Sequence, residues 1–247
     1  MISIRNLHCS FGTKKVLVDI QANIEVGGMY AIMGVNGCGK TTLLRCIGNL
    51  IQPQQGSVTI AGTEVRQYSV RQLAQQVSLV RQHSHTDFEF SAFETVLMGR
   101  NPYQRRFQNE SQHDLDIVER CMRLTNTWEL RFAKPSEMSG GEWQRVMVAR
   151  ALAQDTPVML LDEPTSNLDI AHQFEIMELL VEINRNRQKT ILIVMHDLNL
   201  AYRYCPSLLL LHEHHICYQG ALREGLTPDT IRQVYGVDYP FLQRDNQ

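Results

Sequence analysis

Three short stretches near the start of the chain alternate apolar and polar residues, at positions 2–4, 20–26 and 58–60. A period of two is typical of a strand that buries one face and exposes the other. Antiparallel sheets tolerate one solvated face, whereas parallel sheets are covered on both. We therefore expect a small antiparallel sheet within the first sixty or so residues, as an N-terminal β subdomain.

Three other stretches, at positions 30–33, 158–161 and 191–195, are continuous apolar runs. Such runs fit strands buried on both faces of a parallel sheet flanked by helices. Helical spacing follows the first run, at Leu43, Leu44, Ile47, Leu50 and Ile51. These patterns predict an α/β fold with a mostly parallel sheet.

The middle of the chain, from Phe90 to Pro135, is polar and has helical spacing. Asn109 and Gln112 form a possible capping box before one of its helices. We interpret this stretch as an insertion with its own role, which makes residues 90–155 a helical subdomain within a single domain spanning 1–247.

Composition narrows the possible partners. The chain has 24 Lys or Arg and 26 Asp or Glu, a formal charge of −2, so it lacks the basic surface that nucleic acid requires. No apolar run approaches the roughly 18 residues of a membrane-spanning helix, and no export signal is visible. The six cysteines form no Cys-x-x-Cys pair, which favours free thiols in the cytosol.

A glycine-rich segment follows the first continuous apolar run and precedes helical spacing. It fits the pattern Gly, four residues, Gly-Lys-Ser/Thr, in the strand-to-helix context that this phosphate loop requires. The backbone N–H groups would surround phosphate oxygens, Lys40 would reach the β- and γ-phosphates of ATP, and Thr41 would coordinate Mg²⁺. The predicted ATP-binding residues are Gly34, Asn36, Gly37, Cys38, Gly39, Lys40, Thr41 and Thr42.

Two carboxylates end the second continuous apolar run, in the sequence Asp162-Glu163-Pro164. Ligands of open α/β sheets bind at the carboxyl edge of the strands. We expect Asp162 to hold Mg²⁺ and Glu163 to act as a general base on an attacking water.

Ser139-Gly140-Gly141-Glu142 lies between these two motifs, and the ordered set resembles the ATP-binding-cassette (ABC) ATPases. Ser139 and Glu142 also form a capping box at the start of an apolar helix. The resemblance implies a phosphate-loop NTPase core and a head-to-tail dimer. In that dimer Ser139, Gly140, Gly141 and Glu142 would contact the ATP bound to the second copy.

Four further positions are assigned by this resemblance. It implies that Phe11 stacks on adenine, although a buried core aromatic is the alternative interpretation. It implies that Gln82 touches Mg²⁺ and the attacking water, that Asp169 lies in a loop crossing the dimer interface, and that His196 contacts the γ-phosphate. Met138, Glu142 and Phe11 depart from the usual family residues without removing a group needed for hydrolysis.

Residues 95–102, 196–201 and 226–237 are similar to ATPases of iron-siderophore, haem and cobalamin importers. This similarity implies an ATPase subunit at the cytoplasmic face of the inner membrane, working with separate permease subunits and, indirectly, with a substrate-binding protein. The helical insertion, with Gln82 at its edge, would contact the permease.

Two alternatives remain at this stage. An iron–sulfur cluster assembly ATPase of the same family has a similar size and is separable by co-purification with membrane protein. The segment His212-Glu213-His214-His215 could bind a metal, but its position between two apolar runs favours a polar hairpin turn, with at best His212 and His214 on one side.

Overall fold

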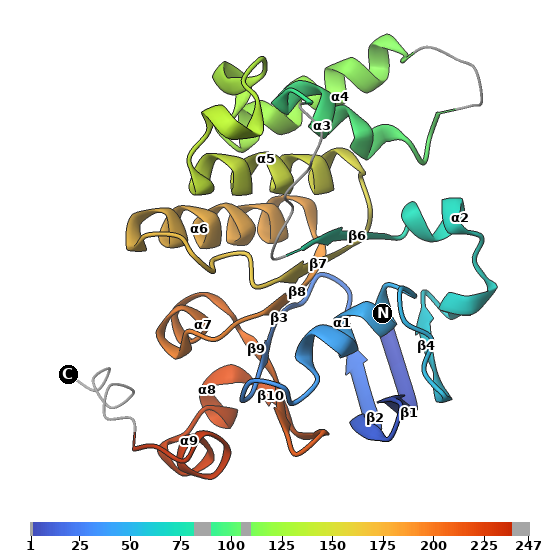
Figure 1. Cartoon of the computed structure of the whole chain (residues 1–247), viewed down its shortest axis with the longest axis vertical. Helices are drawn as coiled ribbons and strands as arrows, with labels where there is room; N and C mark the ends of the chain where they lie inside the picture. Colours follow the sequence, from blue (N-terminus) through green and yellow to red (C-terminus); the bar gives the residue numbers. More distant parts are fainter. Residues whose placement is uncertain (1, 82–89, 105–109, 239–247) are drawn as a thin grey trace.

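Two β-sheets and the helices around them make up the computed structural model, which describes residues 2–81, 90–104 and 110–238 (Figure 1). The smaller sheet is antiparallel, with strand order β2-β1-β4-β5. Its strands are β1 (Ile2–Phe11), β2 (Lys14–Ile24), β4 (Gln55–Ile60) and β5 (Thr63–Glu64). All four lie within the first 64 residues, so the predicted N-terminal sheet is confirmed.

The larger sheet has the order β10-β9-β3-β8-β7-β6. Every pairing in it is parallel except that of β9 with β10. Its strands are β3 (Met29–Met33), β6 (Val77–Val80), β7 (Val158–Asp162), β8 (Thr190–Val194), β9 (Ser207–His212) and β10 (His215–Ala221). The prediction of a mostly parallel sheet is therefore confirmed.

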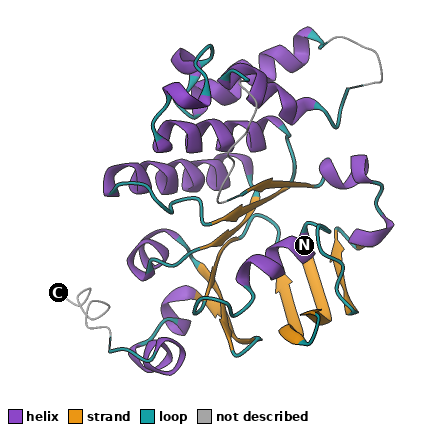
Figure 2. Ribbon diagram, viewed as in Figure 1, coloured by secondary structure: helices purple, strands orange, loops and turns teal. Residues whose placement is uncertain are grey.

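Both faces of the larger sheet are covered, which explains the continuous apolar runs. Along β3, Met29 and Ala31 face one hydrophobic cluster, while Tyr30 and Ile32 face another. The first cluster contains residues of α5 (Gly140–Ala153), α6 (Ile170–Arg187) and α7 (Leu198–Tyr204); the second contains α1 (Lys40–Ile47) and the small sheet. Figure 2 shows α1 between the two sheets.

The remaining helices extend this frame. Helix α1 ends at Ile47 with Gly48 as its C-cap, so the expected helical spacing at Leu50 and Ile51 lies beyond the helix. Short helices η1 (Val65–Gln67) and α2 (Val70–Ala74) precede β6, and α8 (Leu222–Gly225) and α9 (Pro228–Tyr235) follow β10. Among the described helices, none has the length and hydropathy to cross a bilayer.

Helices from the middle of the chain pack on one another at one end of the molecule (Figure 1). They are α3 (Ala92–Leu97), η2 (Met98–Arg100), α4 (Gln112–Leu124), η3 (Trp128–Leu130) and η4 (Pro135–Glu137), together with α5. The capping box of α4 is formed by Ser111 and Asp114, so the prediction for Gln112 was wrong, and Asn109 lies outside the described residues. Asp114, rather than Gln112, completes the capping box because it is the third residue of the helix, from which its side chain reaches back to the N-cap.

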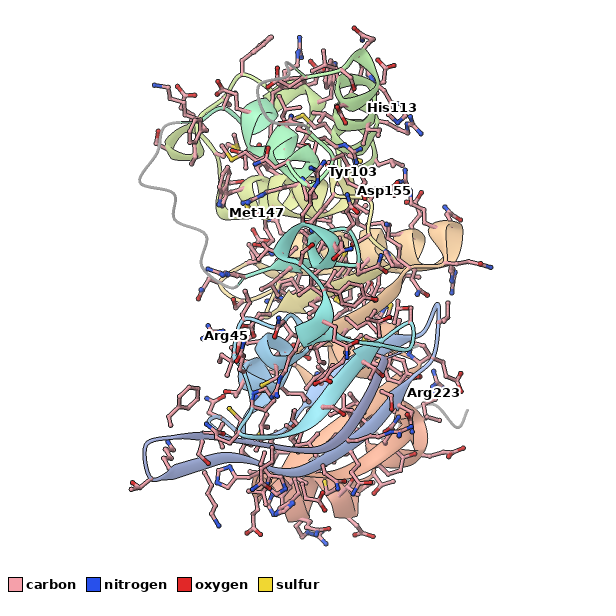
Figure 3. All side chains as sticks on the ribbon, turned by 90° about the vertical axis from the view of Figure 1, so that its right-hand side faces the viewer. Arg45, Tyr103, His113, Met147, Asp155 and Arg223 are labelled. Atoms are coloured by element: carbon pink, nitrogen blue, oxygen red, sulfur yellow. The ribbon has the colours of Figure 1, made fainter. Side chains whose placement is uncertain are left out.

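A buried ion pair fixes the connection between η2 and α4. Arg100 Nε lies 2.9 Å from Asp114 Oδ1, and Arg100 Nη1 donates to the Ala153 carbonyl at 2.7 Å. The ring centroid of Tyr103, which Figure 3 labels, lies 4.1 Å from the guanidinium carbon of Arg100. Arg100 of η2 thus contacts both α4 and the end of α5.

Candidate nucleotide-binding site

The loop between β3 and α1 carries the glycines that the sequence predicts to bind phosphate. Gly34, Gly37 and Gly39 have φ values of 142°, 81° and 109°, in the region that favours glycine. A methyl group on Gly34 would lie 2.2 Å from the Leu211 carbonyl oxygen, so the loop starts in direct contact with β9. Gly39 is the N-cap of α1 without a side-chain cap, which leaves the first backbone N–H groups of the helix for a ligand.

Lys40, the first residue of α1, is buried and folds over the same loop. Its Nζ donates to the carbonyls of Gly34 at 2.9 Å and Val35 at 3.0 Å. Burial lowers the pKa of Lys40, while the thiol of Cys38 and the carboxylates of Glu163 and Asp162 oppose that shift. An ammonium group in this setting is positioned to meet the negative charge of a phosphate.

Cys38 lies inside the loop and is also buried. Burial raises the pKa of its thiol, against the opposing effect of Lys40. Cys38 is therefore a neutral thiol that packs the loop, and its placement gives no sign of a nucleophile.

Thr41 and Asp162 meet where α1 starts beside the end of β7. Thr41 Oγ1 donates to Asp162 Oδ1 at 2.8 Å. Burial raises the pKa of Asp162, while the Thr41 hydrogen bond opposes the rise. A hydroxyl and a carboxylate are oxygen donors of the kind that Mg²⁺ prefers, so these two residues fit the cation.

Glu163 and His196 form the second pair at the same edge of the sheet. His196 Nε2 lies 2.6 Å from Glu163 Oε1, and Glu163 N donates to the Val194 carbonyl at 3.2 Å. Glu163 has φ 52°, in the left-handed region, and its carboxylate contacts His196, whereas that of Asp162 accepts from Thr41. The two neighbouring carboxylates therefore have different partners.

A cleft of about 310 Å³ opens over these residues. Phe11 lies at its rim with 53% of its surface exposed, so the alternative that it is a buried core aromatic does not hold. Asn36 and Thr42 also line the cleft. Its lining comprises Phe11, Lys14, Val16, Asn36, Gly37, Gly39, Lys40, Thr41, Thr42, Glu163 and His196.

Lys14 and Val16 were not predicted from the sequence. Both lie on β2 just after the turn that follows Phe11, and both face the cleft. Residues two apart lie on one side of a strand, but the sequence at the start of β2 does not alternate polar and apolar residues, so no local signal marked these two.

The residues predicted to act on a second copy do not line this cleft. Ser139 is the N-cap of α5 and forms a capping box with Glu142, whose carboxylate accepts from the Ser139 amide and hydroxyl at 2.8 Å. Gly140 is exposed and Gly141 is buried. Asp169 is the exposed N-cap of α6.

Gln82, predicted to touch Mg²⁺ and the attacking water, lies outside the described residues. Its neighbour Arg81 follows the end of β6.

The histidines at 212–215 form the end of the β9–β10 hairpin. Glu213 and His214 have φ values of 46° and 71° and make a two-residue turn. His214 Nδ1 lies 3.1 Å from the Val16 carbonyl oxygen, and His212 pairs with His215 across the strands. His212 and His214 therefore do not share a strand face, and no cluster of three potential metal ligands exists among the described residues.

Known proteins are similar to this chain in both sequence and fold. The family model described as ABC transporter matches residues 17–166. The ferric enterobactin transport ATP-binding protein FepC of Escherichia coli is 38% identical over 231 residues, which cover 94% of this chain and 85% of FepC.

Two solved structures show the same arrangement. One is an inward-facing conformation of a putative metal-chelate type ABC transporter, with TM-score 0.85 and 26% identity over 96% of this chain and 89% of that chain. The other is a dimer of an ATP-binding cassette in a post-hydrolysis state with ADP and Pi. Its TM-score is 0.78 and its identity 28%, over 90% of this chain and 99% of that chain. The expected phosphate-loop NTPase fold is confirmed, and the chain belongs to the ABC transporter family.

Proposed function

We propose that this chain is the ATP-hydrolysing subunit of an importer for a metal chelate of the iron-siderophore, haem or cobalamin type. The observation that carries the proposal is the division of partners beside the phosphate loop, with Asp162 on Thr41 and Glu163 on His196. This arrangement separates a cation ligand from a proton acceptor at one sheet edge. The transport names of FepC and of the metal-chelate type transporter support the cargo class over iron–sulfur cluster assembly.

ATP would occupy the cleft with its phosphates in the loop 34–42 and its adenine against Phe11. Thr41, Asp162 and Gln82 would hold Mg²⁺, which when bound neutralises charge on the β- and γ-phosphates. The Lys40 ammonium would leave the carbonyls of Gly34 and Val35 and donate to phosphate oxygens instead. A hydrogen bond to a charged phosphate is stronger than one to a neutral carbonyl. These residues orient the γ-phosphate for in-line attack.

Glu163 would accept a proton from the attacking water. His196 orients the carboxylate through the 2.6 Å contact and faces the same cleft, from which it would reach the γ-phosphate. Together with Gln82 these are the proposed catalytic residues.

A second copy would complete each site. The start of α5 presents backbone N–H groups and the Ser139 hydroxyl at an exposed position, which suits an anion. In a head-to-tail dimer, Ser139–Glu142 would contact the partner's ATP and the loop 166–169 would cross beside it, with Asp169 as its acid. The dimeric structure with ADP and Pi supports this arrangement.

The permease would contact the predicted helical subdomain, residues 90–155. A groove of about 610 Å³ lies between α2, β6 and α5. Val70, 89% exposed, and Leu73 give it apolar walls, and Arg81 and Arg150 give it charge. With this contact, the chain would be a peripheral subunit on the cytoplasmic face of the inner membrane. A substrate-binding protein would act with it indirectly, through the permease.

The test is Glu163→Gln, which keeps the size of the side chain and removes the base. We expect ATP binding to persist and turnover to fall by about 10²–10⁴-fold, the usual contribution of a general base. Unchanged turnover would reject the role of Glu163. Purification from native membranes then distinguishes transport from cluster assembly: an integral membrane protein should accompany the chain, and Val70→Glu with Arg150→Glu should release it.

A further inference from the structure

The starts of α5 and α6 are in direct contact through a glycine and a histidine. A methyl group on Gly141 would lie 2.5 Å from Cδ2 and 2.7 Å from Cγ of His172, so the imidazole covers the glycine. Leu168, in the loop before α6, contacts Gly140 more loosely, with a corresponding distance of 3.7 Å. The two glycines thus provide the surface on which the loop and α6 rest.

His172 also holds Asp169, the N-cap of its own helix. Its Nδ1 lies 2.7 Å from Asp169 Oδ1, and its backbone N–H donates to the same oxygen at 2.9 Å. The backbone and side-chain hydrogen bonds of His172 keep the pKa of Asp169 below its usual value. One residue therefore contacts both the acid of the loop 166–169 and the start of α5.

The contact continues one helical turn further along both helices. Arg145 of α5 pairs with Glu175 of α6, with Nη1 and Oε2 2.8 Å apart. Helices α5 and α6 run side by side in Figure 1. The starts of the two helices are therefore in contact at two places, Gly141 with His172 and Arg145 with Glu175.

We propose that His172 is a positioning residue that fixes the loop 166–169 on the start of α5, so that both elements approach a second copy's ATP as one unit. This inference rests on the proposed function, in which Ser139–Glu142 and Asp169 serve the same partner site. Fixing two contact elements in advance lowers the entropy lost on association. Dimerisation should therefore depend on His172 although the residue lies outside the cleft.

The experiment uses the Glu163→Gln chain, in which slow turnover preserves bound ATP. Sedimentation measures its ATP-dependent dimerisation, and fluorescent ATP measures binding to the monomer. His172→Gln should weaken dimerisation about tenfold, the effect of losing one hydrogen bond to a charged group. It should leave the affinity of the monomer for ATP unchanged. His113→Gln, an exposed position on α4 far from the sheets (Figure 3), should change neither.

The outcomes separate the two proposals. If the Glu163→Gln chain does not dimerise with ATP, the proposed dimer is wrong. If it dimerises and His172→Gln dimerises with the same affinity, the role of His172 is overturned. If His172→Gln also lowers thermal stability, Asp169→Asn is the second variant, which removes the charge of the partner and keeps the imidazole. Unchanged dimerisation of Asp169→Asn would also overturn the role of His172.

Discussion

The hydroxyl of Thr41 lies 2.8 Å from Oδ1 of Asp162, and the two residues are 121 positions apart in the chain. The pair joins the start of α1 to the end of β7, where two oxygen donors converge beside the phosphate loop. The contact gives the proposed magnesium site its only described ligands, since Gln82 lies outside the described residues.

Thr41→Ala should raise the Mg²⁺ concentration required for half-maximal ATPase activity. The substitution removes one oxygen ligand and leaves the buried Asp162 without its hydroxyl donor. We expect a change of about tenfold or more, because the hydrogen bond from Thr41 that positions the Asp162 carboxylate is worth roughly 1.5–3 kcal/mol. A magnesium titration at saturating ATP measures it. Thr41→Ser keeps the hydroxyl and is the matched control; equal curves for alanine and serine would contradict the assignment.

His196→Ala should lower turnover more than it lowers affinity for ATP. The imidazole contacts Glu163 at 2.6 Å and lines the cleft, so its loss leaves the proposed base without an orienting partner. A decrease of about 10²-fold is expected for a group that positions a general base. Steady-state kinetics separate kcat from KM. His215→Ala, on the exposed hairpin, is the control, and a change confined to KM would argue for a binding role only.

Asp114→Asn should destabilise the helical subdomain. It removes the charge that pairs with Arg100, whose side chain is 5% exposed, and leaves a buried guanidinium without a carboxylate. Breaking a buried pair in this way costs about 3–5 kcal/mol. Chemical denaturation followed by tryptophan fluorescence would measure the loss, since Trp128 and Trp143 both belong to this region. Asp116→Asn, on the same helix, is the control.

The same pair predicts a stability loss in acid. Burial raises the pKa of Asp114, but hydrogen bonds from Ser111 and Arg100 outweigh that effect and hold it below its ordinary value of 3.8. A carboxyl whose pKa is lower in the folded state contributes stability above its unfolded pKa, and the contribution disappears as the pH falls through the folded value. Wild type should therefore lose stability below about pH 4, more than Asp114→Asn does. Parallel losses in both chains would contradict this.

Gly34→Ala and Gly37→Ala should differ, although both glycines have positive φ. A methyl group at Gly34 would meet the Leu211 carbonyl at 2.2 Å and the Cys38 thiol at 2.8 Å, whereas nothing lies within 4 Å at Gly37. In both variants an alanine with positive φ lowers the free energy of unfolding by about 1–2 kcal/mol. Only Gly34→Ala also introduces a clash with the backbone. Thermal unfolding compares them. Equal melting temperatures would show that β9 does not restrict the loop.

Several features could be derived from the sequence alone because their signals are local. The phosphate loop, the Asp-Glu pair and the capping box at Ser139 are contiguous segments whose chemistry depends on spacing. The two kinds of strand were distinguishable because burial on one face gives alternation and burial on both faces gives continuous runs. The family followed from the order of these motifs, and the fold class followed from the strands.

Other features depended on contacts that no local pattern encodes. The helix cap at Ser111 and the end of α1 at Ile47 were misplaced by periodicity, since neighbouring polar residues compete for the same role. The hairpin turn at 212–215 was predicted, but not that His214 is one of its two turn residues. The sequence by itself determined which residues are available for phosphate, magnesium and proton chemistry. Only the tertiary structure decided the pairing of Thr41 with Asp162, of Glu163 with His196 and of His172 with Gly141, because packing of the sheets and helices brings together residues that are distant in the chain.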